Sequence, residues 1–482
     1  MLKRHLPSLL ALAFTVFATT SEAQTVYTQV NIGSQITGSS GSNVVAVGRG
    51  GNVTGNWYPS TGGSQVFFWS KASGVVLVPL DSSMNYAYTS GVTASGLVYG
   101  QTNNSYGQSS FVWTQADGLT ILPGLGGTWS YPYGANASGT VVGSAGDASG
   151  NQVGFMWTRS GGTRNLGLPS GMTSTMANRV DDNGTIYGTC GVAYYQHLCT
   201  WTEAGGWVDR GMPQGTSGFQ FSDVNASGVV VGYAWGNYGQ AYTWIDGTGF
   251  TGLGFLSTQN PYSWPSAISD GGLITGASNA GGSYNPQHAF LYSTSTHTMQ
   301  DLGVLDSTYY GGFAQGVGVS DDGLVVGMSS TGSNGYWHPA AWQGGPPKDI
   351  IPSNYQYSWV YGYRDGIAGG YVQNQSQQLA YVWGFAEPPV VTLLIDPITA
   401  ASSSTGAAVT YTVTSDKGTP VCTADGHPFV SGDILAGGVH AIACTAVDPA
   451  TNASTTVKTT IQVLVIAGIG GGGQAGPQGP AG

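Results

Sequence analysis

The stretch from Asn136 to Trp157, NASGTVVGSAGDASGNQVGFMW, decides the fold because its pattern recurs along most of the chain. An apolar pair followed by glycine precedes a strand-like segment that usually ends in tryptophan, and this tryptophan follows the glycine by 12 to 16 residues. The glycine marker occurs at Val53-Thr54-Gly55, Val98-Tyr99-Gly100, Val141-Val142-Gly143, Ile186-Tyr187-Gly188, Val230-Val231-Gly232, Ile274-Thr275-Gly276, Val325-Val326-Gly327 and Ile367-Ala368-Gly369. The second marker ends at Trp69, Trp113, Trp157, Trp201, Trp244, Tyr292, Trp342 and Trp383, with spacings of 44, 44, 44, 43, 48, 50 and 41 residues.

Eight units of about 44 residues, each with short strands and Asx-Gly turns, are typical of propeller blades. The last unit lacks a fourth strand, and residues Val26 to Gly33 look like a fourth strand without a unit of its own. Pairing of these two ends would leave no open edge. We therefore expect an all-β protein with an eight-bladed β-propeller over residues 24–385. The longer spacings leave a seven-bladed ring as the alternative.

The composition supports short strands and excludes several classes of function. Glycine contributes 79 of 482 residues, and charged residues only 7 %, against about 25 % in ordinary soluble proteins. The formal charge is −11, and the sequence shows no basic stripe that nucleic acid would require. No segment approaches the roughly 18 apolar residues of a membrane span.

The first 23 residues are predicted to be a secretory signal peptide. Lys3 and Arg4 precede an apolar run from Leu9 to Ala18, and Ser21-Glu22-Ala23 is a small-x-small cleavage site. Cleavage removes two positive charges and one negative charge, so the formal charge becomes −12. We expect the protein to be secreted or displayed at the cell surface.

The repeats resemble the bacterial extracellular HAF-repeat family. The resemblance rests on His288-Ala289-Phe290-Leu291-Tyr292 with Asp301-Leu302-Gly303-Val304-Leu305, and on the hairpin from Asn225 to Gly232. It covers about three quarters of the chain, and only one unit has the His-Ala-Phe sequence intact. The resemblance implies an exported repeat protein and says little about activity.

The composition changes after Phe385. Residues 386–389 are a predicted linker, and the alternating pattern of residues 390–466 predicts a small immunoglobulin-like β-sandwich. The segment from Phe429 to Asn452 resembles the HYR modules of extracellular adhesive proteins, although Thr451 stands where those modules usually have glycine. Residues 467–482 form a Gly-rich, collagen-like tail that we expect to be flexible. Trimerisation through this tail is the less favoured alternative, because three Gly-x-y triplets cannot hold a triple helix alone.

Four cysteines in an exported chain predict two disulfides, Cys190–Cys199 and Cys422–Cys444. For the first, one antiparallel register is expected to place Gly188 opposite Trp201 and Cys190 opposite Cys199. No spacing typical of a metal site and no motif of a catalytic nucleophile, metalloprotease or phosphate loop occurs. We therefore predict no catalytic residues, no metal and no cofactor.

Aromatic residues outside the repeat markers point to a binding surface. In a four-stranded antiparallel blade, the connection between the second and third strands and the connection to the next blade emerge at the same end. Tryptophans are expected in both kinds of loop, as a ligand platform. They are Trp129, Trp264 and Trp359 in the connections between blades, and Trp57, Trp235 and Trp337 in the connections between second and third strands.

The alternative for these six tryptophans is packing between blades. The favoured function is a non-enzymatic binding or adhesion protein that presents this aromatic end to a glycan or a cell-surface protein. The alternative is a secreted propeller enzyme that acts on a polysaccharide, for which Asp81, Asp147 and Asp306 are the carboxylates expected at the aromatic end.

Overall fold

The computed structural model describes residues 16–17, 26–81, 84–104, 107–192, 195–236, 238–332, 335–352, 355–374, 377–385, 389–396, 398–400, 406–449 and 454–464. The chain divides into two compact units, one of residues Glu22–Phe385 and one of residues Met1–Ser21 with Ala386–Gly482. Most of the predicted signal peptide, most of the linker and all of the collagen-like tail lie outside the described residues. No described helix is long and apolar enough to span a membrane.

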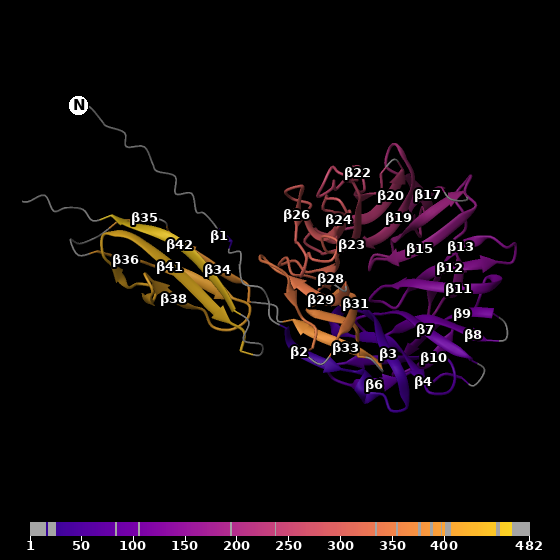
Figure 1. Cartoon of the computed structure of the whole chain (residues 1–482). Coiled ribbons are helices and arrows are strands. Elements are labelled where there is room, and N and C mark those ends of the chain that lie inside the picture. The colour runs from indigo at the N-terminus through magenta and orange to yellow at the C-terminus, as the bar shows by residue number, and fades with distance from the viewer. Residues whose placement is uncertain are drawn as a thin grey trace, which may run out of the picture. The chain divides into compact units, whose positions relative to one another are not determined.

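The larger unit is a propeller-like series of four-stranded antiparallel sheets, which Figure 1 shows fanning around a centre. The sheets are numbered 1 to 8 in chain order. Sheet 1 is β3 (Ser39–Val47), β4 (Val53–Pro59), β5 (Gln65–Ser70) and β6 (Gly74–Leu77); sheet 2 is β7 (Tyr86–Val92), β8 (Val98–Asn104), β9 (Gly107–Thr114) and β10 (Gly118–Ile121); sheet 3 is β11 (Gly126–Ala135), β12 (Val141–Asp147), β13 (Gln152–Thr158) and β14 (Gly162–Asn165); sheet 4 is β15 (Ser174–Val180), β16 (Ile186–Val192), β17 (Tyr195–Thr202) and β18 (Gly206–Gly211).

The second half of the series repeats this arrangement. Sheet 5 is β19 (Thr216–Val224), β20 (Val230–Gly236), β21 (Gln240–Ile245) and β22 (Gly249–Gly252); sheet 6 is β23 (Ser263–Ile268), β24 (Leu273–Asn279), β25 (Gln287–Ser293) and β26 (Thr298–Asp301); sheet 7 is β27 (Ala314–Val319), β28 (Val325–Thr331), β29 (Tyr336–Trp342) and β30 (Lys348–Asp349); sheet 8 is β31 (Tyr357–Arg364), β32 (Ile367–Gln373), β33 (Gln378–Phe385) and β2 (Val26–Asn31). Two 3-10 helices, η1 (Gly33–Gln35) and η2 (Arg49–Gly51), lie in sheet connections.

The two sequence markers face each other across the second and third strands. Val141 lies opposite Trp157 in sheet 3, and the equivalent pairing holds in sheets 1 to 7. In sheet 8 the residue opposite Trp383 is Ala368, so the marker there begins one residue later than the sequence predicts. The marker aromatics are 0–7 % exposed, which agrees with their expected place in the core.

Each marker glycine lies opposite a β-bulge in the first strand of its sheet. In sheet 3 the pairing shifts by one residue between Pro132 and Gly134, directly at Gly143. A Cβ on Gly143 would lie 2.0 Å from the carbonyl oxygen of Tyr131, and in sheet 6 a Cβ on Gly276 would lie 1.9 Å from an equivalent backbone oxygen. The bulge bends the innermost strand, and only glycine can pack against it there.

The turns between first and second strands explain the N-x-x-G part of the repeat. In sheet 3, Asn136 Oδ1 accepts a hydrogen bond from the backbone N–H of Thr140 at 2.9 Å, and Asn225 does the same for Val229 in sheet 5. Gly139, in the fourth position of the motif, has a φ of +82°, which glycine adopts without strain. The turn therefore needs both a side-chain acceptor and a glycine.

The N-terminal strand β2 pairs antiparallel with β33, the third strand of sheet 8, as the sequence predicts. Figure 1 shows the earliest and latest strands of this unit side by side. The first and last sheets are also linked by side chains. Ser42 Oγ accepts from the N–H of Ala380 at 2.9 Å, and Asp365 Oδ2 accepts from the N–H of Gly50 at 2.9 Å.

The C-terminal β region has its own core, built around Val409, Cys444, Val457 and Ile461. Tyr411 donates its hydroxyl to the carbonyl of Phe429 at 2.8 Å. The strands of this unit are β1 (Val16–Phe17), β34 (Val391–Ile395), β35 (Ile398–Ala400), β36 (Ala407–Ala408), β37 (Tyr411–Ser415), β38 (Val421–Ala424), β39 (His427–Pro428), β40 (Ile434–Leu435), β41 (Gly438–Val447) and β42 (Ser454–Leu464).

Both predicted disulfides are present, and the expected register of the first is wrong. Gly188 lies opposite Cys199, and Cys190 lies opposite His197, so the bridge joins diagonal positions of β16 and β17 with a Cα–Cα distance of 5.7 Å. The register follows the marker pairing of Ile186 with Trp201, two residues away from the expected one. Cys422 lies directly opposite Cys444.

Replacement of a marker glycine tests the bulge constraint. We expect Gly143→Ala to lower the free energy of unfolding by about 3 kcal/mol, because the new methyl group must displace the Tyr131 carbonyl. Gly124→Ala is the matched control, since Gly124 is exposed and its added Cβ would come no closer than 3.9 Å to another heavy atom. Equal unfolding free energies in urea for the two variants would contradict the explanation.

Candidate functional site

The two ends of the sheets differ in chemistry. Because successive strands are antiparallel, the turns between first and second strands lie at one end, which we call the turn end. The connections between second and third strands, and those from one sheet to the next, lie at the other, which we call the loop end. The sequence places its candidate binding residues at the loop end.

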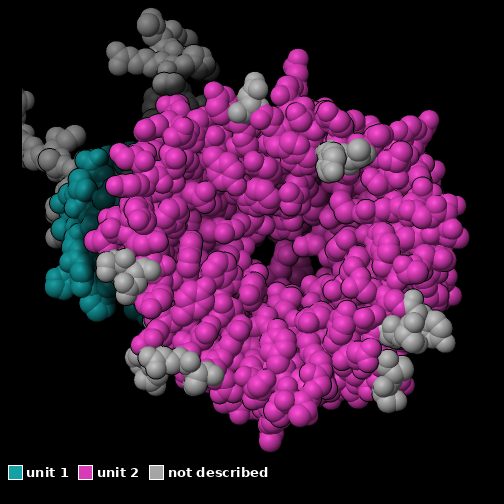
Figure 2. All heavy atoms as spheres, turned by 45° about the vertical axis from the view of Figure 1, so that its right-hand side comes forward, with its two compact units in different colours: residues 1–21, 386–482 teal, residues 22–385 magenta. Residues whose placement is uncertain are grey.

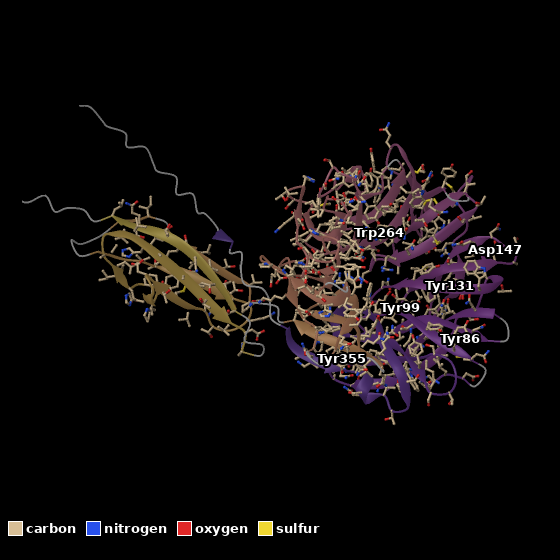
Figure 3. The ribbon with its side chains drawn as sticks, viewed as in Figure 1. Tyr86, Tyr99, Tyr131, Asp147, Trp264 and Tyr355 are labelled. Atoms are coloured by element: carbon tan, nitrogen blue, oxygen red, sulfur yellow. A yellow bond between two sulfur atoms is a disulfide. The ribbon has the colours of Figure 1, made fainter. Side chains whose placement is uncertain are left out.

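The six candidate tryptophans lie near the loop end, but in strands and not in loops. This corrects the expected placement: the hydrogen-bonded strands extend past the sequence markers to include these positions. Trp57 is in β4, Trp129 in β11, Trp235 in β20, Trp264 in β23, Trp337 in β29 and Trp359 in β31. Figure 3 labels Trp264 and, on β11, Tyr131, both on the first strand of their sheets.

These tryptophans pack against aromatic rings of their own and neighbouring sheets. Trp337 of sheet 7 and Trp359 of sheet 8 have ring centroids 5.6 Å apart. The ring centroid of Tyr233 in sheet 5 lies 4.5 Å from that of Trp264 in sheet 6 and 6.5 Å from that of Trp235 in its own sheet.

The six tryptophans differ in how much ring they leave to solvent. The ring of Trp129 is partly covered by Tyr131 of the same strand, with ring centroids 5.4 Å apart. Trp57 is 8 % exposed and belongs to the core cluster of sheets 1 and 8, whereas the other five tryptophans are half-buried.

The strongly exposed aromatic side chains at the loop end are tyrosines. Five of them define what we call the tyrosine face, with exposed fractions of 49–64 %: Tyr195, Tyr238, Tyr284, Tyr310 and Tyr336. Tyr284 and Tyr310 come from neighbouring connections and touch edge to face, with ring centroids 5.0 Å apart. Tyr238, Tyr284 and Tyr310 lie in connections, and Tyr195 and Tyr336 are the first residues of β17 and β29, directly beside a connection. Each lies between two repeat markers in the sequence, as the candidate tryptophans do, and the sequence does not show which of these aromatic residues remain exposed.

A surface pocket of about 350 Å³ opens at the same end, between sheets 7 and 8. Its walls are neutral and polar: Tyr336, Gln356, Tyr357, Gln373 and Asn374. Tyr357 is paired with Gln373 across β31 and β32, so the sheet ladder holds two of these side chains side by side. Amides and phenols offer donors and acceptors without charge.

Two of the carboxylates expected at the loop end are engaged in their own loops. Asp147 Oδ1 accepts from the N–H groups of Ser149 and Asn151, both at 2.8 Å. Asp306 accepts from the N–H groups of Thr308 at 2.7 Å and Gly332 at 3.1 Å. The side-chain contact with Asn151 lowers the pKa of Asp147, and the contact with Thr308 lowers that of Asp306, so both are loop-stabilising anions.

The repeat histidine and aspartate form a recurring pair between third and fourth strands. Nδ1 of His288 lies 2.9 Å from the Asp301 carboxylate, and in sheet 7 Nδ1 of His338 lies 2.7 Å from Asp349. Asp301 also accepts a hydrogen bond from the backbone N–H of Gly303 at 2.8 Å, and this contact lies where the fourth strand ends. These contacts give the His-Ala-Phe and Asp-Leu-Gly sequences a structural role.

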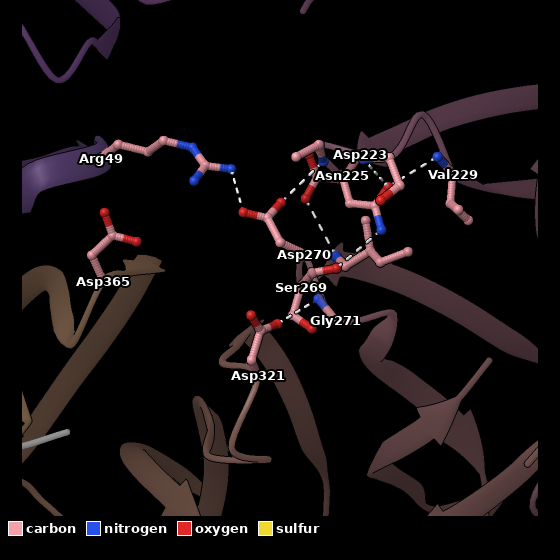
Figure 4. Close-up of polar contacts among 12 residues, drawn as sticks. Arg49, Asp223, Asn225, Val229, Ser269, Asp270, Gly271, Asp321 and Asp365 are labelled. Atoms are coloured by element: carbon pink, nitrogen blue, oxygen red, sulfur yellow. Dashed lines mark hydrogen bonds and ion pairs between the residues drawn. The ribbon is translucent and has the colours of Figure 1, made fainter. Parts of the chain in front are cut away.

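The turn end is charged and tied together by hydrogen bonds between sheets (Figure 4). Asp270 Oδ1 of sheet 6 accepts from the N–H of Ala226 in sheet 5 at 3.0 Å, and its Oδ2 meets Arg49 of sheet 1 at 2.7 Å. Asp321 of sheet 7 accepts from the N–H of Gly271 at 2.6 Å. The carboxylates Asp270 and Asp321 of these turns therefore join their own sheet to a neighbouring one.

A second cavity, of about 420 Å³, is lined by residues of six sheets near the turn end, among them Arg49, Arg179, Asp182, Asp223 and Arg364. Figure 2 shows an opening near the middle of the larger unit. Arg179 is already engaged there, since its guanidinium donates to the carbonyl of Tyr133 at 2.8 Å. Cations and anions balance in this cavity, so its lining selects no net charge.

One cluster has the residue types of a metal site. Cys190, Cys199 and Asp209 lie within reach of a common point. The two sulfurs are joined in a disulfide, so no thiolate ligand remains for a metal. The group is explained by the bridge.

A scan against protein families finds no match for this chain, and neither does a search of curated proteins. Solved structures do resemble it. The β-propeller domain of the Trilobed protease from Pyrococcus furiosus is 9 % identical with a TM-score of 0.44, over 66 % of this chain and 100 % of that one. Virginiamycin B lyase from Staphylococcus aureus is 13 % identical with a TM-score of 0.37, over 74 % and 98 %. The larger unit is similar to these two structures, and its own strand order is that of a propeller-like series of antiparallel sheets.

Proposed function

We propose that this chain is an exported, non-enzymatic binding protein that presents its tyrosine face to a neutral glycan. The observation that carries the proposal is the set of five tyrosines, 49–64 % exposed, that lie in or directly beside connections at one end of the propeller. Aromatic side chains with a polar tip combine a large apolar face with a hydrogen-bonding hydroxyl. Such rings at the surface are suited to the flat apolar face and the hydroxyl groups of a sugar.

The charge distribution favours binding over hydrolysis. A glycoside hydrolase of the usual kind needs two carboxyl groups that flank the bond, one as acid and one as base or nucleophile. At the loop end, Asp147 and Asp306 use their oxygens to hold backbone N–H groups. The tyrosine face and the lining of the pocket between sheets 7 and 8 consist of uncharged side chains, which supports a neutral ligand.

We further infer that the propeller is a closed ring of eight blades, followed by an immunoglobulin-like module. Closure is supported by the pairing of β2 with β33 and by the Gly50–Asp365 and Ser42–Ala380 contacts between first and last sheets. The turns with Asn and Gly and the His–Asp pairs support a place among HAF repeats. The disulfides and the signal-like N-terminus support export.

The first test of function is binding to a panel of neutral hexasaccharides of glucose, xylose, mannose and N-acetylglucosamine. We expect Tyr238→Ala and Tyr284→Ala each to weaken binding about tenfold, on the scale of interface anchors, without lowering the melting temperature. Tyr238→Phe is the control that retains the ring. Because stacking is neutral, affinity is expected to change little between low and high salt.

The same assay separates the alternatives. Release of reducing sugar from the hexasaccharides would identify an enzyme. If both alanine variants bind as tightly as the parent, the tyrosine face is not the binding site. If the protein binds a protein ligand and none of the hexasaccharides, the ligand is not a glycan.

Removal of β2 tests the closed ring. A chain lacking residues 26–31 exposes the edge of β33 and loses the strand that completes sheet 8. We expect the midpoint of thermal unfolding to fall by several degrees and the protein to associate at high concentration. A variant that melts like the parent and stays monomeric would contradict closure through this strand.

A further inference from the structure

The pocket between sheets 7 and 8 has a wall that depends on one histidine. Nδ1 of His338 lies 2.7 Å from Asp349 Oδ2, and Nε2 of the same ring lies 3.2 Å from the backbone carbonyl oxygen of Gln356. Gln356 lines the pocket, and Tyr336 lies two residues before His338 on the same side of β29. His338 therefore connects the strand that carries one wall to the loop that carries another.

Both partners of His338 are hydrogen-bond acceptors. A neutral imidazole has one N–H and can donate to one of them, whereas the imidazolium donates from both nitrogens. The contact geometry is thus satisfied by the protonated ring alone. The adjacent sheet provides a comparison, because His288 makes the same pair with Asp301 but holds no residue that lines this pocket.

The surroundings of the pocket are otherwise neutral. Its lining of two phenols and three amides, with a volume of about 350 Å³, lies at the small end of ligand pockets, which span about 300–1,000 Å³. Gln356 and Gln373 are exposed, whereas Tyr357 is half-buried. The size and chemistry suit a single sugar ring, with phenol rings for its apolar face and amides for its hydroxyl groups.

We propose that this pocket holds one neutral pyranose unit of the glycan, and that protonated His338 keeps the pocket formed by joining Asp349 to Gln356. The inference rests on the proposed function and adds the position of the specific sugar and its dependence on pH. The tyrosine face then provides contacts along the chain of the glycan, while the pocket recognises one unit.

The direction of the pH dependence follows from the charges around His338. The hydrogen bond to Asp349 raises the pKa of His338 above its usual value, against the opposing effect of burial. The contact to Gln356 is therefore complete at pH values below the ordinary histidine pKa of about 6.5, and it is lost as the pH rises through the raised pKa.

The other groups near His338 do not alter this direction. Lys348 and Asp349 lie on β30 and Tyr355 lies in the loop, whereas β28 carries no titratable side chain. The titratable residues of β31 are Tyr357, Tyr361, Tyr363 and Arg364. Of these groups, Asp349 makes the hydrogen bond to the ring.

The experiment measures affinity for the tightest-binding hexasaccharide of the panel by calorimetry at pH 5.5 and pH 9. For the parent protein we expect binding several-fold weaker at pH 9. Gln356→Ala and Gln373→Ala should weaken binding about tenfold at pH 5.5, because each removes an amide from the pocket. His338→Gln should bind equally at both pH values, at the weaker level, while His288→Gln is the matched control that keeps the parent's pH dependence.

The outcomes separate this inference from the proposed function. Loss of binding in Tyr238→Ala with unchanged binding in both glutamine variants would overturn the pocket and leave the tyrosine face. Retention of the pH dependence in His338→Gln, or its loss in His288→Gln, would overturn the role of His338. If no hexasaccharide binds the parent at either pH, the proposed function itself fails, and the pocket inference fails with it. Circular dichroism and melting temperatures at both pH values show whether each variant is folded.

Discussion

The close approach of one glycine in each sheet to a bulged inner strand is the constraint on which the propeller depends. Opposite every marker glycine the first strand shifts its pairing by one residue, and a side chain at Gly143 or Gly276 would collide with a backbone oxygen about 2 Å away. The bulge bends the innermost strand of the sheet. The apolar residues before the glycine and the tryptophan opposite them then fill the space between sheets.

The other repeated polar residues hold the turns and the outer strands of the sheets in place. Asn136 and its equivalents close the turn after the bulged strand, and Asp270 and Asp321 connect that turn to the neighbouring sheet. At the other end, His288 with Asp301 joins the third strand to the fourth. Structural demands thus fix most polar residues of the repeat. The connections at the loop end carry fewer of them, and there the chain places exposed tyrosines and the neutral pocket.

Much of the fold could be predicted because it depends on contacts that repeat. The strand order, the buried tryptophans and the pairing of the N-terminal strand follow from the spacing of the repeat markers, and the two disulfides from the number of cysteines. Details that depend on local register could not. The marker of sheet 8 is displaced by one residue, and Cys190 faces His197 instead of Cys199, because the ladders between second and third strands are set by the pairs Ala368–Trp383 and Ile186–Trp201. Sequence spacing counts residues and does not show which of them pair.

The candidate site shows most clearly which properties the sequence determines and which depend on tertiary structure. The sequence by itself determined a β-propeller repeat, an acidic and charge-poor chain, and an end of the sheets rich in aromatic residues. Which aromatic residues remain accessible was decided by tertiary structure: Trp57 is buried, Trp337 packs on Trp359, and Tyr238 is left 62 % exposed. Tertiary structure also brought Tyr336 of one sheet to Gln373 of the next around a pocket. Exposure and pocket walls arise from packing between sheets, and neighbouring sheets contribute residues that lie far apart in the sequence.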